Sequence, residues 1–157
     1  MIGTKYQKSR RTISDYPYSV IKRPKSHNKL GRRVSGKYFQ DYAMYSLTLE
    51  ERATCPTTCQ RWADCYGNNM PFAHRLQHGL DLEHALFRDV GAACRENPRG
   101  VLVRLHVLGD FYSPEYVGVW EELLATHDNL AAFGYTHRND PACPIHQAIA
   151  DCKMNFG

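Results

Sequence analysis

The sequence predicts a small α/β domain whose mostly parallel sheet is joined by helical crossovers and is preceded by an irregular, basic N-terminal arm. Strand-like and helix-like runs alternate along the chain, and this alternation is typical of parallel strands joined by right-handed helical connections. The chain has 157 residues, of which 43% are hydrophobic, so it has the size of one domain and enough apolar content for a core. An eight-fold α/β barrel needs about 250 residues, and the length excludes one.

Charge divides the chain into a basic arm, residues 1–36, and an α/β cysteine-loop domain, residues 37–157. Residues 1–40 hold 11 of the 20 Lys and Arg residues but only one of the 16 acidic residues. No helical or strand period persists in the arm, and prolines and glycines interrupt it. A cationic segment with interspersed tyrosines suits a nucleic-acid backbone, and a solvated leader is the alternative interpretation.

The domain begins with an expected strand over Ala43–Leu49, followed by a cysteine-bearing loop over Thr54–Tyr66. Apolar residues then recur at helical spacing from about Pro71 to Cys94, and Gly79 divides that stretch. The spacing predicts one helix or two between the cysteine loop and the next strand.

The clearest strand is Val101–Leu108, an apolar run of strand length between turn signals. Ser113 and Pro114 form an N-cap and first helical residue, so we expect a helix that ends near Ala125. A third strand over Leu130–Tyr135 and a last helix from Pro144 to about Cys152 complete the pattern.

Nothing in the sequence predicts a membrane segment. The longest apolar stretch contains Arg104 and His106, and the N-terminus lacks the apolar region of a secretory signal. We therefore expect a cytoplasmic protein with no membrane partner. In a reducing compartment, cysteines serve more often as metal ligands than as disulfides.

Cys55, Cys59 and Cys65 form a C-x3-C-x5-C pattern in a loop. Three clustered thiolates are soft ligands suited to zinc or to an iron–sulfur cluster. The alternatives are buried cysteines without a ligand role, or a disulfide with one free thiol.

The choice between zinc and iron–sulfur depends on a fourth ligand, because a structural zinc site is closed and a cluster can leave one iron open. His74 and His78 are the nearest candidates, although their neighbours suggest a surface helix. Cys143 with His146, and Cys152 beyond them, form a second group that could supply a ligand. Cys94 is expected in the core, and the roles of these later cysteines stay open.

Polar residues follow the second and third strands. Gly109 and Asp110 end the second, and His137 follows the third, so we expect them at the carboxyl edge of the sheet, where α/β proteins bind ligands. His106, Asp110 and His137 also suit a harder metal in a hydrolase. A turn role for Asp110 and a structural role for His106 are the alternatives.

The order of these motifs resembles the radical S-adenosylmethionine superfamily. Its members hold a 4Fe-4S cluster on a three-cysteine loop after the first strand of a partial or full α/β barrel. The resemblance implies a truncated barrel of that type. It places Cys55, Cys59 and Cys65 on the cluster, although superfamily members typically space these cysteines C-x3-C-x2-C.

The same resemblance implies S-adenosylmethionine as a cofactor. Gly109 and Asp110 stand in the place of the motif that meets its amino group, and Tyr66 in the place of the aromatic residue beside the last cysteine. His106 and His137 are further expected cofactor contacts.

A narrower resemblance is to an uncharacterised phage family, the "gene product 88" proteins. Its blocks look like Thr54-Cys55-Pro56, Cys65-Tyr66, the run from Arg104 to Ser113, and Tyr135-Thr136-His137-Arg138. Family members usually continue through another cysteine-rich portion. The resemblance therefore implies a shortened member in the host cytoplasm, completed by a partner subunit or a missing C-terminal portion.

We expect an iron–sulfur protein resembling radical S-adenosylmethionine proteins, with its reaction and any enzymatic activity left open. The alternative is a zinc-stabilised nucleic-acid-binding module that uses the basic arm. The two hypotheses differ in the metal that is bound and in whether the basic arm or the cysteine loop carries the function.

Overall fold

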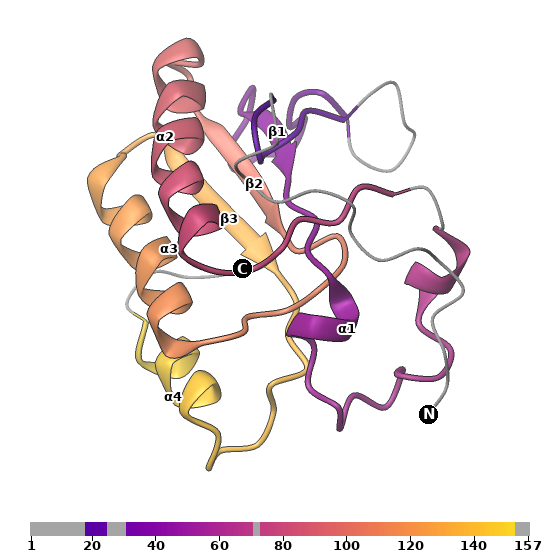
Figure 1. Cartoon of the computed structure of the whole chain (residues 1–157). Helices are drawn as coiled ribbons and strands as arrows, with labels where there is room; N and C mark the ends of the chain where they lie inside the picture. The colour runs from indigo at the N-terminus through magenta and orange to yellow at the C-terminus, as the bar shows by residue number, and fades with distance from the viewer. Residues whose placement is uncertain (1–17, 25–30, 71–72, 153–157) are drawn as a thin grey trace.

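Three parallel strands in the order β1-β2-β3 form the centre of the computed structural model, which describes residues 18–24, 31–70 and 73–152 (Figure 1). The elements in chain order are β1 (Ala43–Ser46), α1 (Glu51–Thr54), the 3-10 helix η2 (Tyr66–Asn69), α2 (Leu80–Glu96), β2 (Val101–Leu105), α3 (Pro114–Thr126), β3 (Leu130–Gly134) and α4 (Pro144–Asp151). The predicted α/β class with a small parallel sheet is confirmed, and within the described residues the sheet is open. No described helix is long and apolar enough to cross a membrane.

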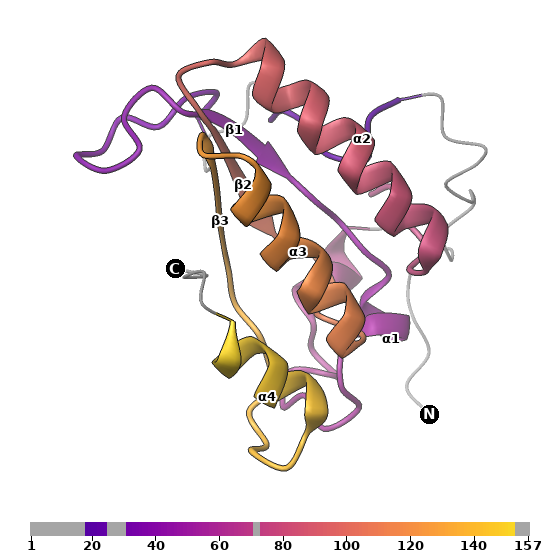
Figure 2. The same cartoon turned by 90° about the vertical axis from the view of Figure 1, so that its left-hand side faces the viewer.

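Helices α2 and α3 cover the same face of the sheet (Figure 2). Val101, Val103 and Leu105 of β2 belong to the core on that face, where they join Trp120 and Leu123 of α3. Side chains alternate between the two faces of a strand, so the residues between these three point to the opposite face. No described helix lies over that second face (Figure 2).

The segment before α2 differs from the prediction. The helix expected from about Pro71 begins only at Leu80, and Pro71 and Phe72 lie outside the described residues. Leu76 instead forms a parallel bridge with Leu49 and donates its N–H to the Thr48 carbonyl at 3.0 Å. Backbone pairing with the chain after β1 therefore overrides the helical spacing.

The predicted strands end one to three residues early in the structure. Leu47 and Leu49 still bond the chain beyond β2, because the Val107 N–H donates to the Leu47 carbonyl at 2.8 Å and the Leu49 N–H to the Leu108 carbonyl at 3.0 Å. These irregular bonds keep the two carboxyl ends together after the ladder stops.

The helix expected after Ser113 is confirmed. The Ser113 hydroxyl accepts the Tyr116 N–H at 3.0 Å, and Pro114 occupies the first helical position. The last helix is confirmed over Pro144–Asp151. The two four-residue helices α1 and η2 were not predicted, because the cysteine-loop composition resembles a turn.

The described part of the basic arm packs along β1. Lys22 and Arg33 form antiparallel bridges with Ser46 and Ala43, and Val20 and Ile21 are 2% and 1% exposed. These residues are thus part of the domain core and sheet. The rest of the arm, residues 1–17 and 25–30, lies outside the described residues.

Candidate functional site at the carboxyl edge of the sheet

Asp110 connects the segments that follow all three strands, and its side chain is buried (1% exposed). One carboxylate oxygen accepts the Phe111 N–H at 2.7 Å and the Thr136 hydroxyl at 2.8 Å, and the other accepts the His137 N–H at 2.8 Å. The Asp110 N–H donates to the Thr54 hydroxyl at 3.1 Å. Asp110 therefore lies where the sequence predicted, at the edge of the sheet, and links residues of three different connections.

Burial raises the pKa of the Asp110 carboxyl above its usual value. Hydrogen bonds from His137, Thr136 and Phe111, and the charge of Arg138, act in the opposite direction. The carboxylate is thus desolvated but supplied with donors that favour its charged form. All three of these donors belong to the protein itself.

Arg138 closes the same edge from β3. Its Nε donates to the Phe111 carbonyl at 3.0 Å, and its Nη2 donates to the Thr54 carbonyl at 2.6 Å. The His146 Nδ1 lies 2.6 Å from the Arg138 backbone carbonyl oxygen, and this contact connects α4 to the chain after β3. Charged donors on carbonyl groups form strong hydrogen bonds, so the connection after β3 is firmly attached to α1.

Gly109 has a packing role beside Asp110. Its φ angle is +92°, and a Cβ atom there would lie 2.7 Å from the Leu49 Cβ and 2.8 Å from the Thr54 Oγ1. Only glycine accommodates both the angle and this close approach. The predicted cofactor residue Gly109 thus allows the chain after β2 to contact the chain after β1.

The three loop cysteines lie in one electrostatic neighbourhood with Asp110. Burial, followed by the charges of Asp110, Cys59 and Cys65, raises the pKa of the Cys55 thiol to about 12. Cys55, Cys59 and Cys65 are free thiols that form no disulfide. Within the described residues, no three His, Cys, Asp or Glu side chains have an arrangement that could hold a metal ion. The thiols are therefore neighbours that do not form a closed ligand set.

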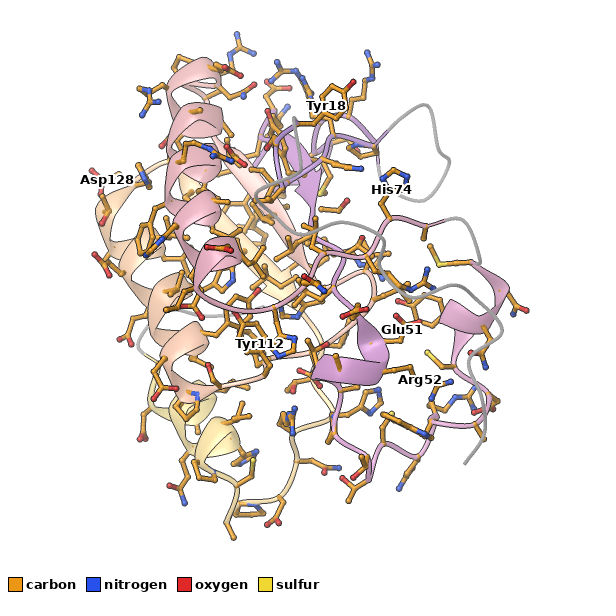
Figure 3. The ribbon with its side chains drawn as sticks, in the orientation of Figure 1. Tyr18, Glu51, Arg52, His74, Tyr112 and Asp128 are labelled. Carbon is orange, nitrogen blue, oxygen red and sulfur yellow. The ribbon has the colours of Figure 1, made fainter. Side chains whose placement is uncertain are left out.

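Arg52 of α1 organises the loop between the second and third cysteines. Its guanidinium lies 4.7 Å from the centre of the Trp62 ring and donates to the Trp62 carbonyl. It also donates to the Asn68 side chain at 3.1 Å, and Asn68 in turn donates to the Ala63 carbonyl. Figure 3 labels Arg52 and its neighbour Glu51 on α1.

A buried ion pair fixes the end of the loop. The Arg75 Nε lies 2.8 Å from the Glu51 Oε2, and the two side chains are 1% and 2% exposed. The remaining Arg75 donors reach the second Glu51 oxygen and the carbonyls of Gly67, Met70 and Ala73 at 2.9 to 3.2 Å. All five guanidinium donors are used, so the segment after Cys65 is held against α1.

His106 lies away from the cysteine loop, against α3. Its Nε2 is 2.9 Å from the Tyr116 hydroxyl, and its ring packs edge-on against Phe111. Burial lowers the pKa of His106 to about 3, so the imidazole is neutral at ordinary pH. The His106 Nδ1 has no hydrogen-bond partner within the part of the chain that the structure describes.

The other two predicted cofactor residues are open to solvent. The Tyr66 side chain follows Cys65 and is 53% exposed. Burial of the phenol raises the pKa of Tyr66, although the charge of Arg104 acts to lower it. His137 is exposed, and its backbone is held by Asp110. These two side chains are available to a ligand.

The sequence interpretation did not identify Glu51, Arg52 and Arg75 as site residues. Charged residues in short runs resemble a solvated surface, and Arg75 fell within the expected helix. The only signal was the run of three charged residues, Glu50 to Arg52, shortly before the first cysteine, and it is not specific.

The family model described as Gene product 88 matches residues 19–148. This range includes the three strands, the cysteine loop and the connections that Asp110 joins. No curated protein and no solved structure matches the chain.

We expect Arg75→Met to lower the free energy of unfolding by about 3–5 kcal/mol, because it leaves the Glu51 carboxylate buried without a partner. Arg99→Met is the matched control, since the Arg99–Asp41 pair at 3.1 Å is exposed and should contribute less than about 1 kcal/mol. Urea denaturation measures both variants. Equal losses would contradict a dominant role for the buried pair.

His106 should make the protein less stable as the pH falls. The folded pKa of about 3 lies below the ordinary value of 6.5, so the unfolded chain binds the proton first, and stability is lost as the pH drops below 6.5. The slope for this residue approaches about 1.4 kcal/mol per pH unit. Urea denaturation from pH 7 to pH 4 should show a shallower fall for His106→Gln than for the parent chain. Parallel curves would show that His106 titrates normally in the fold.

Proposed function

The chain belongs to the Gene product 88 family, and we propose that it binds an iron–sulfur cluster through Cys55, Cys59 and Cys65. The observation that carries the proposal is the position of the cysteine loop at the carboxyl edge of a parallel sheet, where Cys59 and Cys65 lie close enough to Cys55 to raise the pKa of its thiol. Ligands of α/β proteins bind at this edge.

The electrostatics of the thiols favour a cation. Each thiolate charge raises the pKa of Cys55, and Asp110 adds a further negative charge. Iron would replace the thiol protons and offset this repulsion, because metal ions bind the deprotonated sulfur. The thiol donors also match the soft-ligand chemistry of clusters.

The loop is anchored at its ends, and Arg52 holds its middle through the Trp62 carbonyl. Cys55 follows α1 directly, and the segment after Cys65 is held by the Glu51–Arg75 pair. A loop of this kind can bring three thiols together around a metal without disturbing the sheet. When bound, a cluster supplies electron-transfer chemistry that no side chain provides.

We extend the proposal to S-adenosylmethionine and to a partial barrel of the radical S-adenosylmethionine type. The exposed Tyr66 and His137 side chains suit cofactor contacts beside the loop. Asp110 and Gly109 would position the surrounding backbone, since Asp110 already accepts three hydrogen bonds from the protein. His106, buried against Tyr116, would support this edge from the helix side.

Iron and acid-labile sulfide should be measured in the full chain purified without oxygen. We expect about four of each per chain and a broad brown absorbance. Cys55→Ala, Cys59→Ala and Cys65→Ala together should remove both. The matched control replaces the other cysteines, Cys94, Cys143 and Cys152, by alanine and should retain both.

Equal iron in the two triple variants would contradict the proposed ligands. One zinc per chain without colour would contradict the cluster and support the second candidate below. Circular dichroism of both variants separates ligand loss from unfolding.

A zinc-stabilised nucleic-acid-binding module is the second candidate function. It is favoured by the exposed basic residues along β1, namely Lys22, Arg23, Arg32 and Arg33. Such a surface could contact successive phosphates.

Substitution tests this candidate better than deletion, because Val20 and Ile21 lie in the core. If the basic residues bind phosphates, changing all four to Gln should weaken binding of labelled single-stranded DNA or RNA at least tenfold at about 50 mM salt. Fluorescence anisotropy measures this, with Arg88→Gln/Arg95→Gln on α2 as the control. Unchanged affinity, or an equal loss in the control, would contradict the module.

A further inference from the structure

Arg104 lies at the centre of the sheet, on the face opposite to α2 and α3. Its neighbours on β2, Val103 and Leu105, belong to the core beneath the helices, so Arg104 points the other way. β2 is the middle strand, and Arg104 is only partly exposed. A guanidinium is therefore held against the sheet face that no described helix covers (Figure 2).

Within residues 18–24, 31–70 and 73–152, the Arg104 guanidinium has neither a hydrogen bond nor an ion pair. The other arginines around the site differ: Arg52, Arg75 and Arg138 each donate to carbonyl or carboxylate oxygens. A partly desolvated guanidinium gains considerably from an anion that accepts its paired donors.

The surroundings of Arg104 provide further polar and aromatic groups on the same face. The strand register places Ser46 of β1 on one side of it and Phe133 of β3 on the other, both half-buried. Parallel partners in register point to the same face. The Leu47 N–H donates to the Arg104 carbonyl at 3.2 Å, which places Arg104 beside the chain that leads from β1 into α1 and the cysteine loop.

We propose that Arg104 binds an oxyanion, the carboxylate or phosphate of a small ligand, on the face of the sheet opposite to α2 and α3, beside the cysteine loop. The planar guanidinium matches either anion with two donors. Ser46 supplies a hydroxyl donor on the same face, and Phe133 supplies an aromatic wall. This inference rests on the proposed function. It adds that the ligand of the cysteine centre would carry a negative charge.

The test follows the Arg104 Nε–H signal of the isotopically labelled full chain in proton–nitrogen spectra. Inorganic pyrophosphate and succinate are titrated separately, so that the two anion chemistries are distinguished. We expect a saturable shift with at least one of them. Arg104→Met should weaken binding at least tenfold, whereas Arg95→Met, an exposed arginine on α2, should leave it unchanged.

Arg104→Lys keeps the charge but loses the paired donors, so it should bind with an affinity between those of the parent and Arg104→Met. It also gives a readout if Arg104→Met fails to fold. No saturable shift with either anion, or equal affinity in the parent and the Arg104 variants, would overturn the inference.

Iron content measured on the same samples separates the two proposals. Retained iron without anion binding would overturn only the Arg104 site. Anion binding without iron in the parent chain would overturn only the cluster.

Discussion

The Asp110 carboxylate is the interaction on which the arrangement of the site depends. It accepts hydrogen bonds from the connections after β2 and β3, and its N–H reaches Thr54 after β1. Parallel strands leave their connections at one edge, where the backbone N–H groups need acceptors. A single buried carboxylate satisfies several of them at once and thereby sets where the cysteine loop starts relative to His137.

Arginine side chains hold the segments around that carboxylate in place. Arg138 ties the chain after β3 to Thr54, while Arg52 and Arg75 hold the two sides of the cysteine loop. Carbonyl oxygens or Glu51 accept most of their donors, although the buried Arg52 Nε has no hydrogen-bond partner within the described residues. Arg104 differs from these three arginines, because within the described residues its side chain has no such partner and no helix covers its face of the sheet.

The residues at this edge of the sheet fall into a buried group and an exposed group. Asp110 and His106 are buried against Thr54 and Tyr116, and the partly buried Gly109 packs against Leu49. Tyr66 and His137 remain exposed beside the loop. The exposed side chains and the buried groups that position the surrounding backbone are thus different residues of the same short motifs.

The sequence by itself determined the elements whose signals are local. The apolar run that starts at Val101 made β2, and the Ser113-Pro114 cap began α3, because strand burial and helix capping depend on neighbouring residues. The place of Asp110 after a strand also followed from the sequence order, and the resemblance to the gene product 88 family was confirmed over residues 19–148.

Only the tertiary structure decided the long-range pairings. Leu76 forms hydrogen bonds with the chain after β1 and is not in the expected helix. Arg75 pairs with Glu51, which lies 24 residues away in the sequence. The strand register set Arg104 between Ser46 and Phe133 on the uncovered face. These choices depend on groups far apart in the chain, whose burial and hydrogen bonding outweigh local propensity, so no single segment encodes them.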